Sequence, residues 1–177
     1  MKKIFAFILI MFACLCNAIG QNFGDLSFNT INGDSIHLNS YLGKKTLFII
    51  APISETDPVY SQLQNFKSRY LDTVRVVCIF SKEDGYTSSN SSTIQAIYNE
   101  MGVILSDGLY TKKSSGTNQA PIMKWLTDKT QNTHFDMDAG GIGHKFFVDE
   151  TGRLFGVLPP GSSLSSFIID RIVHSGQ

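Results

Sequence analysis

The residues best placed to do chemistry lie in a polar turn between an apolar run and an amphipathic stretch. The segment LFIIAPISETDPVYSQLQNF, residues 47–66, carries hydroxyl and carboxyl groups at Ser54, Glu55 and Asp57. A serine hydroxyl acts as a nucleophile only beside a base that takes its proton and a third group that orients the base. No Gly-x-Ser-x-Gly sequence surrounds Ser54, which argues against the nucleophile elbow of a hydrolase.

Thiol chemistry has a single candidate beyond the start of the chain. Two of the three cysteines, Cys14 and Cys16, lie near the amino terminus, and the third, Cys78, lies within VRVVCIF. A continuous β-branched run is typical of a strand that is buried on both faces. We therefore interpret Cys78 as a small core residue, because a reactive thiol needs an exposed and electropositive setting.

Metal and nucleotide signals are weak, and we expect no metal and no cofactor. The histidines are scattered over the chain, at His37, His134, His144 and His174. The densest donor cluster is His134 with Asp136 and Asp138, and HFDMDAGG reads more simply as a polar loop. The Gly-x-Gly of GGIGHK precedes a predicted strand instead of joining a strand to a helix, so it does not indicate a dinucleotide site.

Composition limits the partners. The 177 residues, 42% of them apolar, are enough for one domain with a real core. Fifteen basic and fifteen acidic residues give a net charge of zero, which argues against nucleic acid and against a polybasic membrane surface. A protein or a small molecule remains as the expected class of partner, and its identity is unknown.

Residues 1–20 are predicted to be a signal peptide, and residues 21–177 the domain. Lys2 and Lys3 precede the apolar run 4–13, and Cys16-Asn17-Ala18 offers small residues for cleavage. That run is too short to span a membrane. The chain is thus expected to be exported, to the periplasm or the medium, with a lipid anchor at Cys14 as the alternative.

The elements that must position the turn follow from periodicity and turn residues. Asn32-Gly33 predicts a tight hairpin, and residues 46–51 and 74–80 predict strands. Asp57 is expected to cap a helix that begins at Pro58. Apolar residues recur at helical spacing along it and predict one buried face, made of Val59, Leu63, Phe66 and Tyr70.

The second half of the chain continues the alternation. Helices are expected over residues 93–101 and over 121–129, where Trp125 is a core anchor, and a hairpin is expected to turn at residues 150–152. A final helix is predicted to share one apolar face among Leu164, Phe167, Ile168 and Ile172. Together these elements predict an α/β domain of three layers, a central mixed sheet flanked by helices.

Almost all of residues 21–177 resembles the glutathione peroxidase family. SFNTINGDSIHLNSYLGKKTLFII is similar to the family's opening, with its Tyr-x-Gly-Lys entry to the first core strand. DPVYSQLQNFKSRY resembles its first helix, and KFFVDETGRLFGVL its closing hairpin. A further family pattern falls on Gly116, Asn118, Pro121, Lys124, Trp125 and Leu126. The resemblance implies a thioredoxin-like fold and, for intact members, reduction of peroxides by a thiolate or selenolate.

The residues that would carry this activity depart from the family. Alignment back from Pro58 places Ser54 at the nucleophile position, and alignment forward from Gly43 places Glu55 there. The family's glutamine falls on Glu83, its second cysteine on Ser81, and its Trp-Asn pair on Gly141 and Ile142. An alcohol cannot pass through the sulfenic acid that peroxide reduction requires.

The resemblance also makes His144 the best candidate base for Ser54, because it would begin the strand beside the turn. Two function classes remain open. The first is an exported relative without peroxidase activity, kept as a binding or interaction module. The second is a thiol or peroxide oxidoreductase that uses Cys78 or a thiol supplied by a partner, in a response to oxidative stress.

Overall fold

A computed structural model describes residues 21–70 and 72–175. The predicted signal peptide, residues 1–20, and the cysteine proposed as a lipid anchor, Cys14, lie outside the described residues. In the described part of the chain, no helix is both long and apolar enough to cross a membrane.

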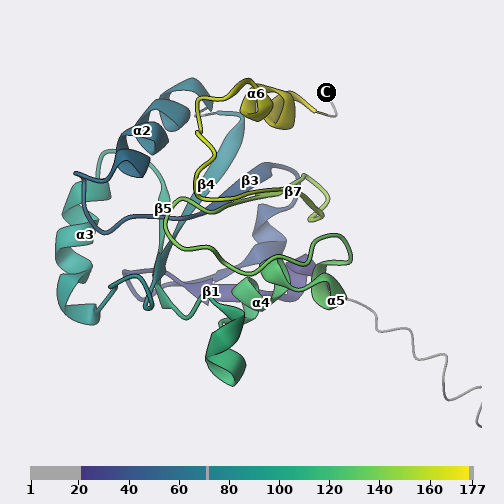
Figure 1. Cartoon of the computed structure of the whole chain (residues 1–177), viewed down its shortest axis with the longest axis horizontal. Coiled ribbons are helices and arrows are strands. Elements are labelled where there is room, and N and C mark those ends of the chain that lie inside the picture. Colours follow the sequence, from purple (N-terminus) through teal and green to yellow (C-terminus); the bar gives the residue numbers. More distant parts are fainter. Residues whose placement is uncertain (1–20, 71, 176–177) are drawn as a thin grey trace, which may run out of the picture.

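A five-stranded mixed sheet forms the centre of the molecule (Figure 1). Its strands are β3 (Lys45–Ile50), β4 (Val74–Ser81), β5 (Ile104–Leu109), β6 (Lys145–Val148) and β7 (Leu154–Leu158). Their order is β5-β4-β3-β6-β7, in which β3 pairs parallel with β4 and antiparallel with β6. The carboxyl end of β3, and the turn that follows it, therefore lie next to the amino end of β6.

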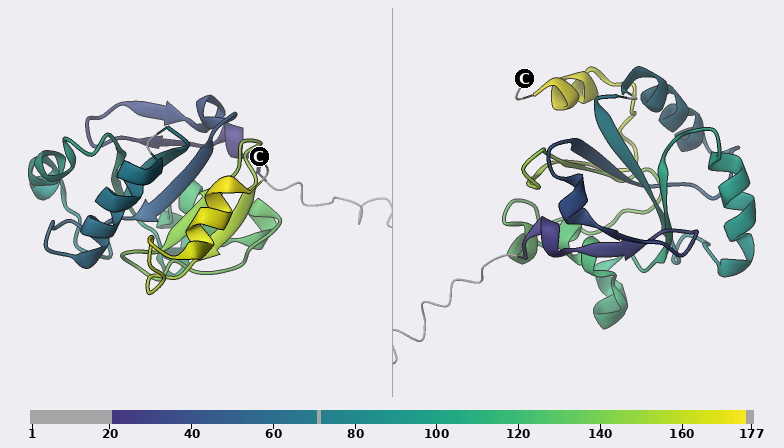
Figure 2. Two further views of the ribbon diagram at one scale, coloured as in Figure 1. Left: turned by 90° about the horizontal axis from the view of Figure 1, so that it is seen from above. Right: turned by 180° about the vertical axis from the view of Figure 1, so that it is seen from behind.

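Helices cover both faces of this sheet, as the layer prediction required (Figure 2). One face packs against α2 (Pro58–Tyr70), α3 (Ser91–Tyr98) and α6 (Phe167–His174). The other packs against α4 (Pro121–Thr127) and the hairpin of β1 (Ser27–Asn29) and β2 (Ser35–His37). The short elements are α5 (Lys129–Asn132), η1 (Phe23–Asp25), η2 (Leu38–Tyr41), η3 (Ser88–Asn90) and η4 (Lys113–Asn118).

Strand β3 is buried on both faces because its neighbours pair with both of its edges and helices cover its two sides. Leu47 and Ile49 point into the core beneath α2, whereas Phe48 and Ile50 point into the core beneath α4. All six residues of β3 are buried, as the continuous apolar run predicts. Cys78 lies opposite Ile49 on β4 and is also fully buried, which confirms its interpretation as a core residue.

Helix α2 begins where the sequence predicts. The Asp57 carboxylate accepts a hydrogen bond of 2.8 Å from the Val59 amide, and Pro58 takes the first helical position, where no amide donor is needed. Leu63, Phe66 and Tyr70 are buried, which confirms the predicted apolar face of this helix. The turn of residues 51–57 is thus held between a buried strand and a capped helix.

The two hairpins are also confirmed. β1 and β2 pair antiparallel around Gly33, whose φ of 88° is the conformation that a tight turn demands of its glycine. β6 and β7 pair antiparallel around Gly152, with a φ of 84°. The first turn was predicted at Asn32-Gly33, and the second at residues 150–152 between two expected strands.

Two helix boundaries differ from the prediction. The helix expected over residues 121–129 stops at Thr127, because the Asp128 side chain accepts a hydrogen bond from the Thr130 amide and caps the separate helix α5. Trp125 is buried, as expected of a core anchor. The helix expected over residues 93–101 occupies Ser91–Tyr98 instead.

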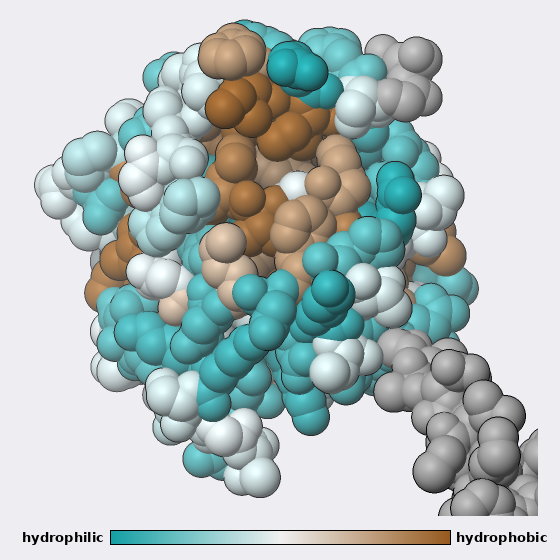
Figure 3. Space-filling model, turned by 45° about the vertical axis from the view of Figure 1, so that its right-hand side comes forward, coloured by the Kyte–Doolittle hydropathy of each residue, from teal (hydrophilic) through white to brown (hydrophobic). Residues whose placement is uncertain are grey.

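The predicted face of the last helix is wrong. α6 begins only at Phe167, so Leu164 packs from the preceding loop, and the helix turns Ile169 and Val173 toward the core. Phe167 and Ile168 are instead 69% and 44% exposed. Figure 3 shows the resulting apolar area, to which Phe155 and Ile172 also contribute around a shallow pocket.

This reassignment of the α6 face is testable by truncating residues on its two sides. Ile169→Ala should lower the free energy of unfolding by about 2–4 kcal/mol, because it leaves a cavity in the core. Phe167→Ala, the matched control on the exposed side, should change it by less than about 0.5 kcal/mol. Urea unfolding followed by circular dichroism measures both, and equal losses would contradict the assignment.

Candidate functional site

The serine of the turn after β3 is exposed to solvent, and its hydroxyl forms hydrogen bonds within the turn. Ser54 Oγ lies 2.9 Å from Thr56 Oγ1 and accepts a hydrogen bond of 3.3 Å from the Thr56 amide. Glu55 is exposed beside it. Within the described residues no imidazole or carboxylate forms a hydrogen bond with Ser54, so the hydroxyl has no base to activate it.

The fold nevertheless brings together the segments that the resemblance predicted around this turn. A methyl group placed on Gly85 would lie 3.4 Å from the Ile53 side chain, so the loop after β4 lies against the turn. A methyl group on Gly141 would lie 3.5 Å from the Asp84 carboxylate, so the loop before β6 joins the same region. The turn, the loop after β4 and the loop before β6 therefore form one neighbourhood.

Glu83, where the resemblance places the family's glutamine, holds the chain after β5. Its carboxylate accepts hydrogen bonds from the amides of Thr111 and Lys112 and from the hydroxyl of Ser115, at 2.7–3.1 Å. Ser81, at the position of the second cysteine, donates to the same carboxylate at 3.0 Å. These two positions therefore form a structural clamp.

The charge of this clamp is stable over a wide pH range. Burial alone would raise the pKa of Glu83, but the hydrogen bonds from Ser115, Thr111 and Lys112 outweigh it and lower the pKa to about 2. A carboxylate with this many donors has no lone pair left to polarise a peroxide. The sequence did not reveal the clamp, because its donors lie about thirty residues further along the chain.

The loop before β6 supplies backbone in place of the family's Trp-Asn pair. Gly141 and Gly143 have φ angles of 89° and 84°, which side-chain-bearing residues rarely adopt, so these positions are shaped for a tight loop. Ile142, which is half-buried, has no polar group to offer. Residues 141–143 thus form a tight backbone turn and bring no hydrogen-bonding side chain to the region.

His144 lies close to the turn, as predicted, but its ring belongs to the core beneath α4. The residue is 1% exposed, and its ring stacks on Phe146 with 4.5 Å between centroids. Nδ1 accepts a hydrogen bond of 2.8 Å from the Gly140 amide, so the proton of the neutral ring is on Nε2. Among the described residues Nε2 has no partner, and the ring is not a base for Ser54.

Electrostatics keep this imidazole neutral. Burial and the Lys145 ammonium lower the pKa of His144 to about 4, against a smaller opposing effect of Asp138. Lys145 is itself 1% exposed, and burial lowers its pKa to about 8. Its ammonium donates a hydrogen bond to the carbonyl of Gly143.

Lys145 is a site residue that the sequence reasoning missed. Its side chain leaves β6 on the α2 side of the sheet, opposite Ile49, near the end of β3 that leads to the Ser54 turn. A lysine placed just before the apolar run FFV was the available signal. Its buried amine, with a lowered pKa, makes Lys145 a candidate for chemistry in this region.

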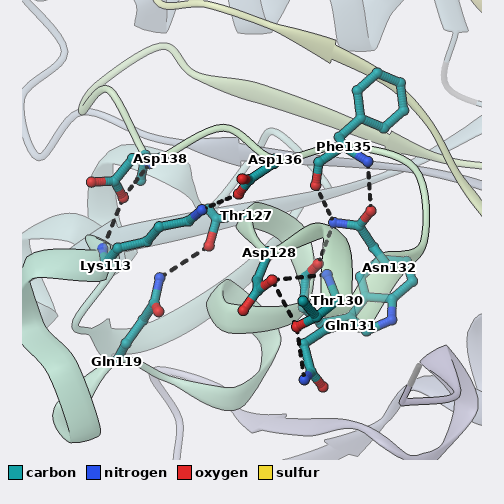
Figure 4. Close-up of polar contacts among 12 residues, drawn as sticks. Lys113, Gln119, Thr127, Asp128, Thr130, Gln131, Asn132, Phe135, Asp136 and Asp138 are labelled. Carbon is teal, nitrogen blue, oxygen red and sulfur yellow. Dashed lines mark hydrogen bonds and ion pairs between the residues drawn. The ribbon is translucent and has the colours of Figure 1, made fainter. Parts of the chain in front are cut away.

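The polar loop of residues 134–138 is held by separate contacts (Figure 4). Asp136 pairs with the Lys113 ammonium, whereas the Asp138 carboxylate accepts a hydrogen bond of 2.8 Å from the Lys113 amide. His134 Nδ1 lies 2.9 Å from the carbonyl of Asn132. Within residues 21–70 and 72–175, no three histidine, cysteine or acidic side chains gather as a metal site would need.

The state of His144 gives a prediction about pH. An unfolded histidine titrates near pH 6.5 and His144 near pH 4, so the unfolded chain binds more protons as the pH falls between these values. We expect the contribution of the neutral His144 ring to the free energy of unfolding to be complete above pH 6.5 and to be lost as the pH falls toward 4.

Proton NMR of the imidazole C–H signals, assigned with His144→Gln, measures the midpoint directly. The other histidines of the chain serve as internal references in the same titration. A midpoint between pH 6 and 7 for His144 would contradict the buried, neutral ring.

Comparison with known proteins identifies the fold through solved structures. The sequence has no significant match to a protein-family model or to a curated protein. The structure is similar to that of Trgpx in its apo form, with a TM-score of 0.64, 17% identity, and coverage of 86% of this chain and 94% of that one. It is similar to GPX1 of T. cruzi, with a TM-score of 0.59, 11% identity, and coverage of 86% and 97%.

A third similar structure is a secreted disulfide oxidoreductase of Mycobacterium tuberculosis that is homologous to E. coli DsbE. Its TM-score is 0.50 at 14% identity, with coverage of 85% of this chain and 96% of that one. Identities this low show the fold and leave the activity open. The chain has a thioredoxin-like α/β fold, whose structural neighbours include glutathione peroxidases and DsbE-like oxidoreductases.

Proposed function

We propose that this chain is an exported thioredoxin-like protein without peroxidase activity, which works as a binding or interaction module. The observation that carries the proposal is the exposed Ser54 hydroxyl at the turn where the resemblance places a nucleophilic sulfur. Oxygen in an alcohol has no counterpart of the thiolate-to-sulfenic-acid step, so the turn cannot reduce a peroxide by that route.

Cys78 is poorly suited to replace the missing sulfur. Its side chain is 0% exposed in the middle of β4, and burial raises the pKa of its thiol, an effect that the nearby Lys67 ammonium only partly offsets. A thiolate is the nucleophile in peroxide reduction, and here it is strongly disfavoured. The structure thus supports the binding module over an oxidoreductase that acts through this cysteine.

The remaining positions around the turn point the same way. Glu83 is occupied by the clamp, and Gly141 and Ile142 provide no polar side chain. A peroxidase site needs donors that hold and polarise the peroxide beside the sulfur. Several parts of that machinery are changed together, while the fold that carried them is kept.

Peroxide consumption by the purified protein tests the proposal, with glutathione and thioredoxin as separate reductants. We expect no turnover above the uncatalysed rate, because the one thiol among the described residues, that of Cys78, is buried. Ser54→Cys is the comparison: activity in this variant alone would support the proposal and identify the missing sulfur as the sole defect. Turnover by the wild-type chain that disappears in Cys78→Ser would overturn it.

Export is the part of the proposal that rests on sequence alone. Lys2, Lys3 and the apolar run 4–13 have the layout of a signal peptide. When the whole chain is expressed in a bacterium, we expect it outside the cytoplasm with an amino terminus near residue 21. Edman sequencing of the fractionated protein decides this, and an intact Met1 in the cytoplasmic fraction would refute export.

A further inference from the structure

Helices α2 and α3 lie side by side on one face of the sheet (Figures 1 and 2). Side chains of both helices line a groove between them. Its volume is about 460 Å³, within the range of small-molecule sites in proteins. Its walls are Tyr60, Gln64, Lys67, Ser68, Ala96, Ile97, Asn99, Glu100 and Met101. None of these residues belongs to the turn of residues 51–57, so the groove is separate from the Ser54 region.

A buried lysine without a counterion lines this groove. Lys67 is only 9% exposed, and within the described residues its ammonium makes no hydrogen bond and no ion pair of 4.0 Å or less. Burial and the neighbouring Lys44 lower the pKa of Lys67, while Asp72 and Cys78 oppose them weakly. The stem of Lys67 is buried, while its ammonium is not one of the enclosed polar atoms and reaches solvent at the groove. An anion in the groove would gain a charge-assisted contact with it.

The other polar groups of the α2 wall are already engaged. The Tyr60 hydroxyl donates to the carbonyl of Ile97 at 2.8 Å, and the Gln64 amide donates to the Tyr60 oxygen at 3.3 Å. The Ser68 hydroxyl donates to the carbonyl of Gln64 at 3.0 Å. Of the four α2 side chains in this wall, Lys67 is thus the one that makes no hydrogen bond to another described residue.

The α3 wall combines apolar surface with one acid. Ile97 and Met101 belong to the core beneath α2 or pack against it, and they present apolar surface to the groove. Glu100 is exposed at the rim. A second negative charge on a ligand would be repelled there, whereas a single anionic group at Lys67 would not need to approach the rim.

We propose that the groove between α2 and α3 binds a small organic monocarboxylate. Its carboxylate pairs with the Lys67 ammonium, and its apolar body lies against Ile97 and Met101. The site adds a ligand class to the chain and does not depend on whether the Ser54 turn is redox-silent. In the alternative, the lysine stem only covers apolar surface and its ammonium is hydrated in the groove.

Benzoate is a suitable probe because it joins one carboxylate to a flat apolar body. Benzyl alcohol has a similar body without the charge, and benzylamine reverses the charge. Titration of the purified protein, followed by ¹⁵N–¹H NMR and by calorimetry, should show benzoate shifting amides of α2 and α3. We expect benzoate to bind about tenfold or more tightly than either analogue, as a charge-assisted contact in a partly buried site predicts.

Three variants make the test specific to the groove. Lys67→Met removes the charge at similar length and should weaken benzoate binding about tenfold or more. Ala96→Phe fills the groove from the exposed surface of α3, leaves Lys67 in place, and should abolish binding. Lys82→Met, the matched control, removes an exposed lysine elsewhere and should bind as the wild type does.

The outcomes that overturn the site are distinct from those of the peroxide assay. Equal binding of benzoate and benzylamine, or unchanged benzoate binding in Lys67→Met or in Ala96→Phe, would refute it. Circular dichroism checks that each variant is folded. If Lys67→Met does not fold, Ala96→Phe still tests the groove. Peroxide turnover by the wild-type chain would refute the proposed function and leave the groove as it is.

Discussion

The burial of β3 on both of its faces is the constraint on which the rest of the structure depends. Paired with β4 on one edge and β6 on the other, the strand has no exposed side, and all six of its residues are buried. Two cores form because Leu47 and Phe48 point in opposite directions along the same strand. After β3, Ala51 and Pro52 are still buried, and the chain reaches water only from Ile53 onward. The turn with Ser54 therefore lies at the end of the sheet, beside the loop that precedes β6.

Local patterns predicted this frame well, because each of its parts is encoded by adjacent residues. A continuous apolar run indicated β3, a proline after an aspartate indicated the start of α2, and Asn32-Gly33 indicated the first hairpin. The failures have equally local causes. Asp128 interrupts a helical pattern with a new cap, and α6 starts too late for Leu164 to belong to it, so its buried face is rotated.

The candidate site was harder to predict, because its side chains are defined by distant contacts. The clamp at Glu83 uses donors from a segment beyond β5. The partners of His144, the Gly140 amide and the Phe146 ring, are near it in the sequence, but only the folded loop and strand β6 bring them onto the imidazole. Likewise, Lys67 follows Phe66 on a helix whose apolar face was predicted correctly. Its buried stem, however, lies near Gly102, where an added methyl group would be 3.8 Å from Lys67 Cε. Sequence pattern identified the missing sulfur, while only tertiary packing identified the buried amines.

The tryptophan in α4 gives the molecule a built-in optical reporter. Trp125 is the single tryptophan of the chain, and its indole donates a hydrogen bond of 2.9 Å to the carbonyl of Gln21 while it packs 5.2 Å from the ring of Phe23. Its emission spectrum therefore reports on the environment of a single position, where residues 21–23 pack against α4. Detachment of that segment and unfolding of the core beneath α4 would both expose the indole to water and shift its emission to longer wavelength, so no added dye is needed.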